Sequence, residues 1–179
     1  MRNLLSLLLL LSLSLSLSAQ SKYYTRSGHI WFFSETPLEN IEAHNRQVTA
    51  LLNPDKSVAV SLLQKSFKFP IALMQEHFNE SYVESNEFPR ATFNGKIENF
   101  DFNKEGKQKV TAKGVLSMHG VATKIEAPVT LRMDDGHVYV NSVFTVDPKD
   151  YDIEIPTNVA DKIAESIVVH VELDLVEAQ

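Results

Sequence analysis

The chain has 179 residues, no cysteine, and 23 acidic against 17 basic side chains, which gives a formal net charge of −6. Without cysteine it can form no disulfide, thiolate zinc site or cysteine nucleophile, and it lacks the acceptor for lipoprotein acylation. The acidic balance, with no Lys/Arg cluster, excludes the electrostatic footprint of a nucleic-acid-binding or anionic-membrane-binding protein. With 44% hydrophobic and 22% charged residues, the composition is that of one ordinary globular domain.

Residues 1–19 predict a secretory signal peptide. Arg2 supplies a positive n-region, Leu4 to Leu17 form the apolar stretch, and Leu17-Ser18-Ala19 provides a small-residue end. This stretch is shorter than the roughly 20 apolar residues that a spanning helix needs. We therefore expect cleavage near Ala19, a mature domain over residues 20–179, and a periplasmic or secreted protein with no integral membrane segment after cleavage.

Alternation of apolar and polar residues predicts β-strands along most of the mature chain. The last strand is the clearest, because apolar side chains from Ile167 to Leu175 interleave with His170, Glu172 and Asp174. Asp134-Asp135-Gly136 predicts a tight hairpin turn. The predicted strands cover residues 28–34, 58–62, 93–97, 110–118, 124–133, 138–146 and 167–175.

Glycine and helical signals complete the pattern. Gly95 is expected inside the 93–97 strand, as a bend or bulge, because an Asn94-Gly95 hairpin turn would leave only a stub strand before it. Pro70 fits a first helical position, and one apolar face follows, made of Ile71, Met74, Phe78 and Tyr82. A second short helix is predicted with Thr157 as its cap and Val159 and Ile163 one turn apart. Antiparallel strands with short turns and little helix indicate an all-β barrel or sandwich.

Three motifs narrow the choice of fold. They are KGVLSMHGVATK at 113–124, NEFPRATF at 86–93 and DYDI at 150–153. In their order and spacing the chain resembles the YceI-like family, exported bacterial proteins with an antiparallel, lipocalin-like β-barrel, over about residues 24–175. The resemblance implies an amphiphilic lipid, such as a polyisoprenoid or an isoprenoid-quinone-like molecule, held along the barrel axis. The chain departs from the family at 74–82, so ligand contacts from that segment are not carried over.

Strand parity alone nominates the side chains that face the inside of such a barrel. An eight-stranded barrel can be filled by its own side chains or can hold one small ligand. Each nominated residue therefore has two possible roles, packing or ligand contact. The helix after Pro70 should pack its apolar face against the barrel or its mouth. The nominated residues are Phe93, Ile97, Leu116, Met118, Val129, Leu131 and Phe144.

Signatures of metal binding and catalysis are missing. The six histidines never occur as H-x-H or H-x-x-x-H, and His77 with Glu80 supplies only two ligands. The chain has no G-x-S-x-G, S-x-x-K, H-E-x-x-H, Walker A or G-x-G-x-x-G motif. We expect no cofactor, no metal and no enzymatic activity.

Three functions remain open at this stage. The first is an exported protein that sequesters or carries an amphiphilic lipid. The second is a packed barrel that acts through its surface, as an envelope stress or partner-binding module. The third is a small enzyme that acts on a lipid. The sequence does not identify the ligand or the oligomeric state.

Overall fold

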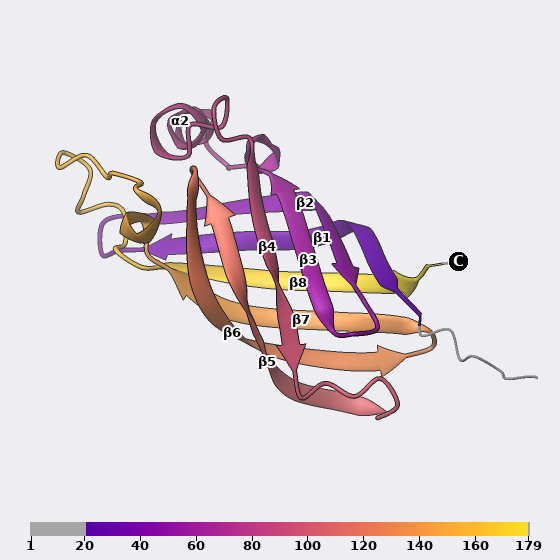
Figure 1. Cartoon of the computed structure of the whole chain (residues 1–179). Coiled ribbons are helices and arrows are strands. Elements are labelled where there is room, and N and C mark those ends of the chain that lie inside the picture. Colours follow the sequence, from indigo (N-terminus) through magenta and orange to yellow (C-terminus); the bar gives the residue numbers. More distant parts are fainter. Residues whose placement is uncertain (1–20, 179) are drawn as a thin grey trace, which may run out of the picture.

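The computed structural model describes residues 21–178, which form a closed antiparallel barrel of eight strands (Figure 1). Consecutive strands pair with each other, and β8 pairs with β1 to close the ring. The predicted all-β class and the antiparallel barrel are confirmed. The predicted signal peptide, 1–19, lies outside the described residues. The strands are β1 (Tyr23–Glu35), β2 (Asn40–Leu52), β3 (Ser57–Leu63), β4 (Arg90–Glu98), β5 (Gly106–Met118), β6 (Val121–Asp134), β7 (His137–Val146) and β8 (Ile167–Glu177).

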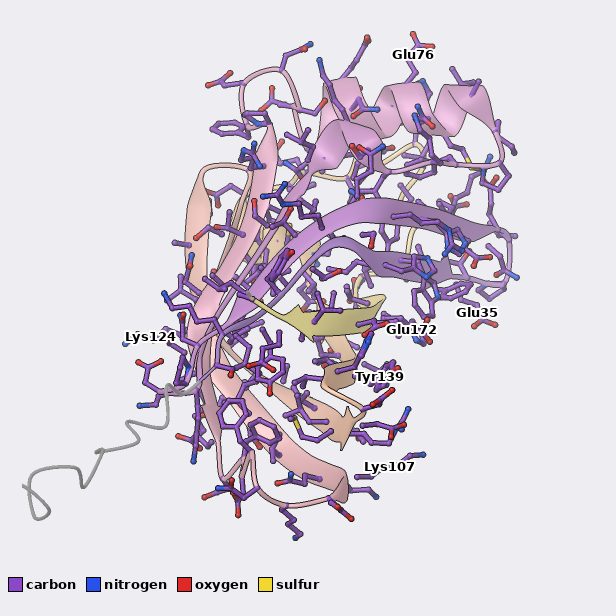
Figure 2. All side chains as sticks on the ribbon, turned by 90° about the vertical axis from the view of Figure 1, so that its right-hand side faces the viewer. Glu35, Glu76, Lys107, Lys124, Tyr139 and Glu172 are labelled. Atoms are coloured by element: carbon purple, nitrogen blue, oxygen red, sulfur yellow. The ribbon has the colours of Figure 1, made fainter. Side chains whose placement is uncertain are left out.

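The two ends of the barrel differ. One end, called the mouth here, carries the helical segments and the β5–β6 turn (Figure 1). Glu76 on α2 points away from the barrel there, whereas Lys107 lies at the opposite end, the base (Figure 2). The helical segments are η1 (Gln64–Ser66), α2 (Ala72–His77), η2 (Phe78–Tyr82) and η3 (Pro148–Tyr151).

Strand β2 was not predicted, because its inward positions change parity along its length. Near the mouth the buried side chains are at odd-numbered positions, and near the base they are at even-numbered positions. The register between β1 and β2 slips between Thr25 and Ile30. Such a β-bulge adds one residue to a strand and reverses the face that the following residues present. The buried residues of β2 are Ala43, Asn45, Val48, Ala50 and Leu52.

The helix expected after Pro70 exists, but it begins at Ala72 and changes its winding. Ile71 has extended backbone angles and precedes the first turn. At Phe78 the helix widens into a π-helical turn, in which the Val83 amide donates to the Phe78 carbonyl oxygen at 2.9 Å. Single π-helical turns inside helices are frequent near functional sites.

The second predicted helix, with Thr157 as its cap, is wrong. Residues 157–163 form successive turns in which Val159 donates to Pro156 and Lys162 donates to Val159, each across three residues. The Ala164 amide donates instead to the Ser34 hydroxyl oxygen on β1, at 2.8 Å. This hydrogen bond to the barrel replaces one that would continue a helix.

Two tight turns connect the long strands at opposite ends. Asp135 and Gly136 have φ of 46° and 75°, and His119 and Gly120 have φ of 50° and 75°. Positive φ at both central residues is the type I′ geometry that matches the twist of a hairpin. The hairpin turn predicted at Asp134-Asp135-Gly136 is therefore confirmed.

Aromatic side chains seal the base. The Phe100 and Phe102 rings contact each other edge to face at 4.7 Å, and Tyr23 stacks on Phe102 at 5.9 Å. Buried Gln108 holds the β4–β5 loop over this end, because its side-chain amide donates to the carbonyl oxygens of Asp101 and Lys104. The base is thus closed by apolar packing under a hydrogen-bonded loop.

Candidate functional site: the barrel cavity

The mouth half of the barrel is hollow, whereas the base half is packed. A cavity of about 590 Å³ lies between the strands, under α2 and η2, within the size range of small-molecule sites. All eight strands contribute to its wall, together with residues from the β1–β2 turn and from the 148–163 segment. The two alternatives for the barrel interior, filled or open, therefore apply to different halves of the same barrel.

Six of the seven nominated residues lie on the cavity wall and one does not. Leu131 is fully buried in the packed half, next to Val140 of β7 and outside the cavity. Strand parity identifies the inward face of a strand but not how deep in the barrel a residue lies. It therefore predicts the same role for Leu131 as for Val129. That the wall residues contact a ligand stays a prediction. The six residues on the wall are Phe93, Ile97, Leu116, Met118, Val129 and Phe144.

An aromatic cluster on the wall was missed by the sequence interpretation. The Phe78 ring of η2 lies 5.7 Å from Phe32 of β1, 5.6 Å from Phe67 and 5.1 Å from Phe69. Phe67 and Phe69 belong to the connection between η1 and α2, which no repeating pattern marked as inward-facing. The cluster ties the helical segment to the barrel and covers one side of the cavity.

Two glycines shape the opposite wall. Gly95 lies inside β4, as predicted, and pairs directly with Gly114 of β5 with no break in register, so it forms no bulge. A Cβ on Gly114 would lie 2.6 Å from the Gly95 Cα and 2.7 Å from Phe93 Cζ. The Phe93 ring therefore lies over the glycine pair, an arrangement in which an aromatic ring covers a gap left by glycine.

Polar groups on the cavity wall are few, and two of them are already hydrogen bonded to backbone carbonyl oxygens. The Ser142 hydroxyl donates to the Pro128 carbonyl oxygen at 2.7 Å, and the Gln64 amide donates to Phe88 O at 2.8 Å. The acidic and basic side chains on the wall all belong to mouth segments outside the strands. They are Glu39, His77 and Lys162.

Comparison with known proteins assigns the family. Residues 19–175 match the YceI-like domain. The chain belongs to the YceI-like family. No curated protein sequence matches it. Among residues 21–178, no helix is both long and apolar enough to cross a membrane.

Solved structures share the fold of this YceI-like chain at low sequence identity. A polyisoprenoid-binding domain from Saccharophagus degradans superimposes with a TM-score of 0.75 at 13% identity, covering 88% of this chain and 98% of that one. BcnA from Burkholderia cenocepacia gives 0.70 at 15% identity, with coverage of 82% and 95%. The YceI protein of Campylobacter jejuni gives 0.65 at 14% identity, with coverage of 81% and 89%. At these identities the likeness concerns the barrel itself.

The segment that departs from the YceI-like pattern lies directly over the cavity. Residues 74–82 form most of α2 and all of η2, and Met74, His77, Phe78 and Tyr82 contribute to the wall. Burial raises the pKa of the Tyr82 hydroxyl above its ordinary value of 10.0. This hydroxyl therefore stays neutral, able to donate or accept a hydrogen bond at the mouth.

Three of the histidines lie on the outer face of the barrel rather than in the cavity. His29 Nε2 lies 2.9 Å from His44 Nδ1, and the Trp31 ring stacks between His29 at 4.4 Å and His170 at 4.8 Å. Burial, together with the charges of Arg46 and His44, lowers the pKa of His29. In residues 21–178 no three His, Asp or Glu side chains converge on a point that could hold a metal ion.

Proposed function

We propose that this YceI-like chain is an exported binding protein that sequesters or carries an amphiphilic lipid, with the apolar tail in the barrel cavity. The observation that carries this proposal is the cavity of about 590 Å³, whose wall is apolar except for a few residues. We infer binding rather than catalysis, because among the described wall residues the hydroxyls of Ser34 and Ser142 are hydrogen bonded to backbone groups rather than to a basic side chain.

The distribution of polar groups gives the ligand an orientation. A tail that enters the cavity leaves water, and each buried methylene stabilises the complex by about 0.8 kcal/mol. A charged or polar head group would lose hydration without new hydrogen bonds if it entered the deep part of the cavity. The tail therefore points to the base, and the head group stays near Glu39, His77 and Lys162 at the mouth.

The apolar tail of the ligand can also be assigned to a chemical class. One structural relative is described as a polyisoprenoid-binding domain. The wall is rich in Val, Ile and Phe, so it offers an apolar surface along a tail of this kind. We propose a polyisoprenoid or an isoprenoid-quinone-like lipid as the ligand.

The proposal is tested by the lipid that accompanies the protein. Leu116→Trp puts a large side chain into the cavity, whereas Val115→Trp puts the same side chain on the outward face of the same strand. Native mass spectrometry of the wild type, purified from its own host, should show a lipid adduct that Val115→Trp keeps and Leu116→Trp loses, while both variants stay folded.

Two results would count against a carrier. A wild-type protein without any lipid, together with a Leu116→Trp variant that melts far below the wild type, indicates an interior filled by side chains and favours the surface-acting alternative. Equal amounts of lipid on all three proteins would place the ligand outside the cavity.

A further inference from the structure

On three neighbouring strands the cavity ends between two consecutive inward residues. On β6, Val129 lies on the cavity wall, but Leu131, the next inward residue, does not. The same change occurs on β7 between Val140 and Val138, and on β8 between Leu173 and Leu175. We call the first inward residues beyond the cavity on these strands the floor and define it as Leu131, Val138 and Leu175, which belong to one buried core.

The three floor side chains are apolar and buried. Leu131 and Val138 have 0% exposure and Leu175 has 2%. Val138 pairs directly with Leu175, whereas Leu131 pairs with Val140, so Leu131 is offset by two residues along the strands from the Val138–Leu175 pair. Leu52 and Phe100 are buried in the same core. Protein interiors packed in this way resist compression, so a tail that reaches the floor cannot push further.

Above the floor, two neighbouring strands carry small side chains on the cavity wall. Ala112 of β5 pairs with Ala127 of β6, and both line the cavity. Ala112 is the last wall residue of β5 toward the base, whereas Val129 lies between Ala127 and the floor on β6. Larger residues at the two alanines would narrow the deep part of the cavity. The alanine pair thus keeps the deep part of the cavity open.

We propose that the floor, together with the Ala112–Ala127 pair above it, sets the longest apolar tail that this protein accepts. The proposal rests on the proposed function, and it names the residues that determine tail length. Met118 at the mouth and Ala112 near the floor are six residues apart on β5, which is about 20 Å along the strand. With the tilt of strands in a barrel, this corresponds to a tail depth of roughly 15 Å.

A series of prenols tests the proposal. Geraniol, farnesol and geranylgeraniol share one head group and differ in the number of prenyl units. Their affinities are measured by displacement of the uncharged fluorescent probe N-phenyl-1-naphthylamine. Each methylene that enters the cavity raises affinity about fourfold. In the wild type, affinity should therefore rise steeply with length until the tail reaches the floor, and then stay constant.

Two variants should move this plateau in opposite directions. Leu131→Ala opens space below the floor, so the plateau should shift to a longer prenol. Ala112→Leu fills space above the floor, so the plateau should shift to a shorter one. Thr130→Ala, an outward neighbour of Leu131 on β6, is the matched control and should keep the wild-type plateau. A melting curve for each protein verifies that it is folded.

The outcomes separate this proposal from the proposed function. A plateau at the same length in Ala112→Leu and in the wild type would overturn the floor as the determinant of tail length, even if prenols bind well. If Leu131→Ala does not fold, the milder Val138→Ala and Ala112→Leu decide the question. If neither the probe nor any prenol binds the wild type, the proposed function itself is rejected.

Discussion

His119 on the β5–β6 turn is paired with Glu84, which follows η2, and the His119 Nε2 atom lies 2.8 Å from the Glu84 carboxylate. The other ring nitrogen, Nδ1, lies 2.8 Å from the carbonyl oxygen of Tyr151 in η3. Both partners are hydrogen-bond acceptors, so only an imidazole protonated on both nitrogens can donate to both. Burial lowers the pKa of His119, but the Tyr151 and Glu84 hydrogen bonds and the charges of Glu84 and Asp152 outweigh it, so the pKa is raised above 6.5.

This junction should make the stability of the mouth depend on pH. A histidine whose pKa is higher in the folded state stabilises the fold fully below its unfolded pKa, and this stabilisation is lost as pH rises through the folded pKa. The difference in melting temperature between the wild type and His119→Gln should therefore be largest below about pH 6.5 and shrink above it. Thermal melts across neutral pH, with an NMR titration of His119, measure both quantities.

The comparison needs controls because a second histidine, His29, has a pKa that burial shifts in the opposite direction. The pKa of His29 is lowered, so its contribution has the opposite sign, and only differences between variants isolate His119. Glu84→Gln should remove most of the pH dependence, because a carboxamide can donate to neutral Nε2. His137 pairs with Asp174 at the base, far from this junction. His137→Gln should therefore keep the pH dependence that His119 causes. If the difference in melting temperature between the wild type and His119→Gln is the same at every pH, His119 is not the source of the pH dependence.

The Phe78 ring should stabilise both the helical segment and the bound tail. Changing a fully buried Phe to Ala lowers the free energy of unfolding by about 3–5 kcal/mol. Because Phe78 is half-buried, we expect Phe78→Ala to lower it by roughly 2 kcal/mol. Phe78→Ala should also weaken binding of N-phenyl-1-naphthylamine, because the ring forms part of the wall. The control is Leu73→Ala on α2, which is 58% exposed and should shift the denaturation midpoint little. Equal midpoints for the two variants would show that the aromatic cluster does not hold the helix.

Strand parity predicted the inward face of the barrel well, because alternation is a local property of the chain. The same property repeats every second residue, so it could not distinguish Val129 on the cavity wall from Leu131 beneath the cavity. Only the convergence of side chains from distant strands decides depth. Strand parity also could not predict the contacts among Phe32, Phe67 and Phe78, because the three rings come from separate parts of the chain.

Local patterns failed where a tertiary interaction overrides them. In β2 the bulge reverses the face, and buried Asn45 looks polar in sequence, although its side chain is satisfied by the Leu63 carbonyl oxygen at 2.9 Å. In residues 157–163 the i, i+4 pair Val159 and Ile163 suggested a helix, yet both residues face the cavity from a series of turns. Their apolar character reflects the cavity rather than a helical face.

Export of the chain is a separate prediction from the N-terminal sequence. A signal peptide ending in Leu17-Ser18-Ala19 should be removed, so N-terminal sequencing of protein from the envelope or medium should begin at or near Gln20. Because Leu17 is larger than the usual residue three positions before the cut, a start one or two residues away is also consistent with export. Intact Met1 on protein recovered from the cytoplasm would contradict it.

The glycine pair offers the sharpest test of how the barrel wall is built. A Cβ on Gly114 would approach the Gly95 Cα to 2.6 Å and Phe93 Cζ to 2.7 Å, so in Gly114→Ala the strands must separate and the ring must turn into the cavity. We expect the free energy of unfolding to fall by about 1–3 kcal/mol, as at other overpacked sites, and N-phenyl-1-naphthylamine to bind more weakly.

Phe93→Ala, combined with Gly114→Ala, removes the ring but leaves the contact between the two backbones. The double variant should therefore recover probe binding relative to Gly114→Ala while its denaturation midpoint stays below that of Phe93→Ala alone. A Gly114→Ala protein that melts and binds like the wild type would show that this wall has room for a side chain, and that the Phe93 ring is not held in place by the two glycines.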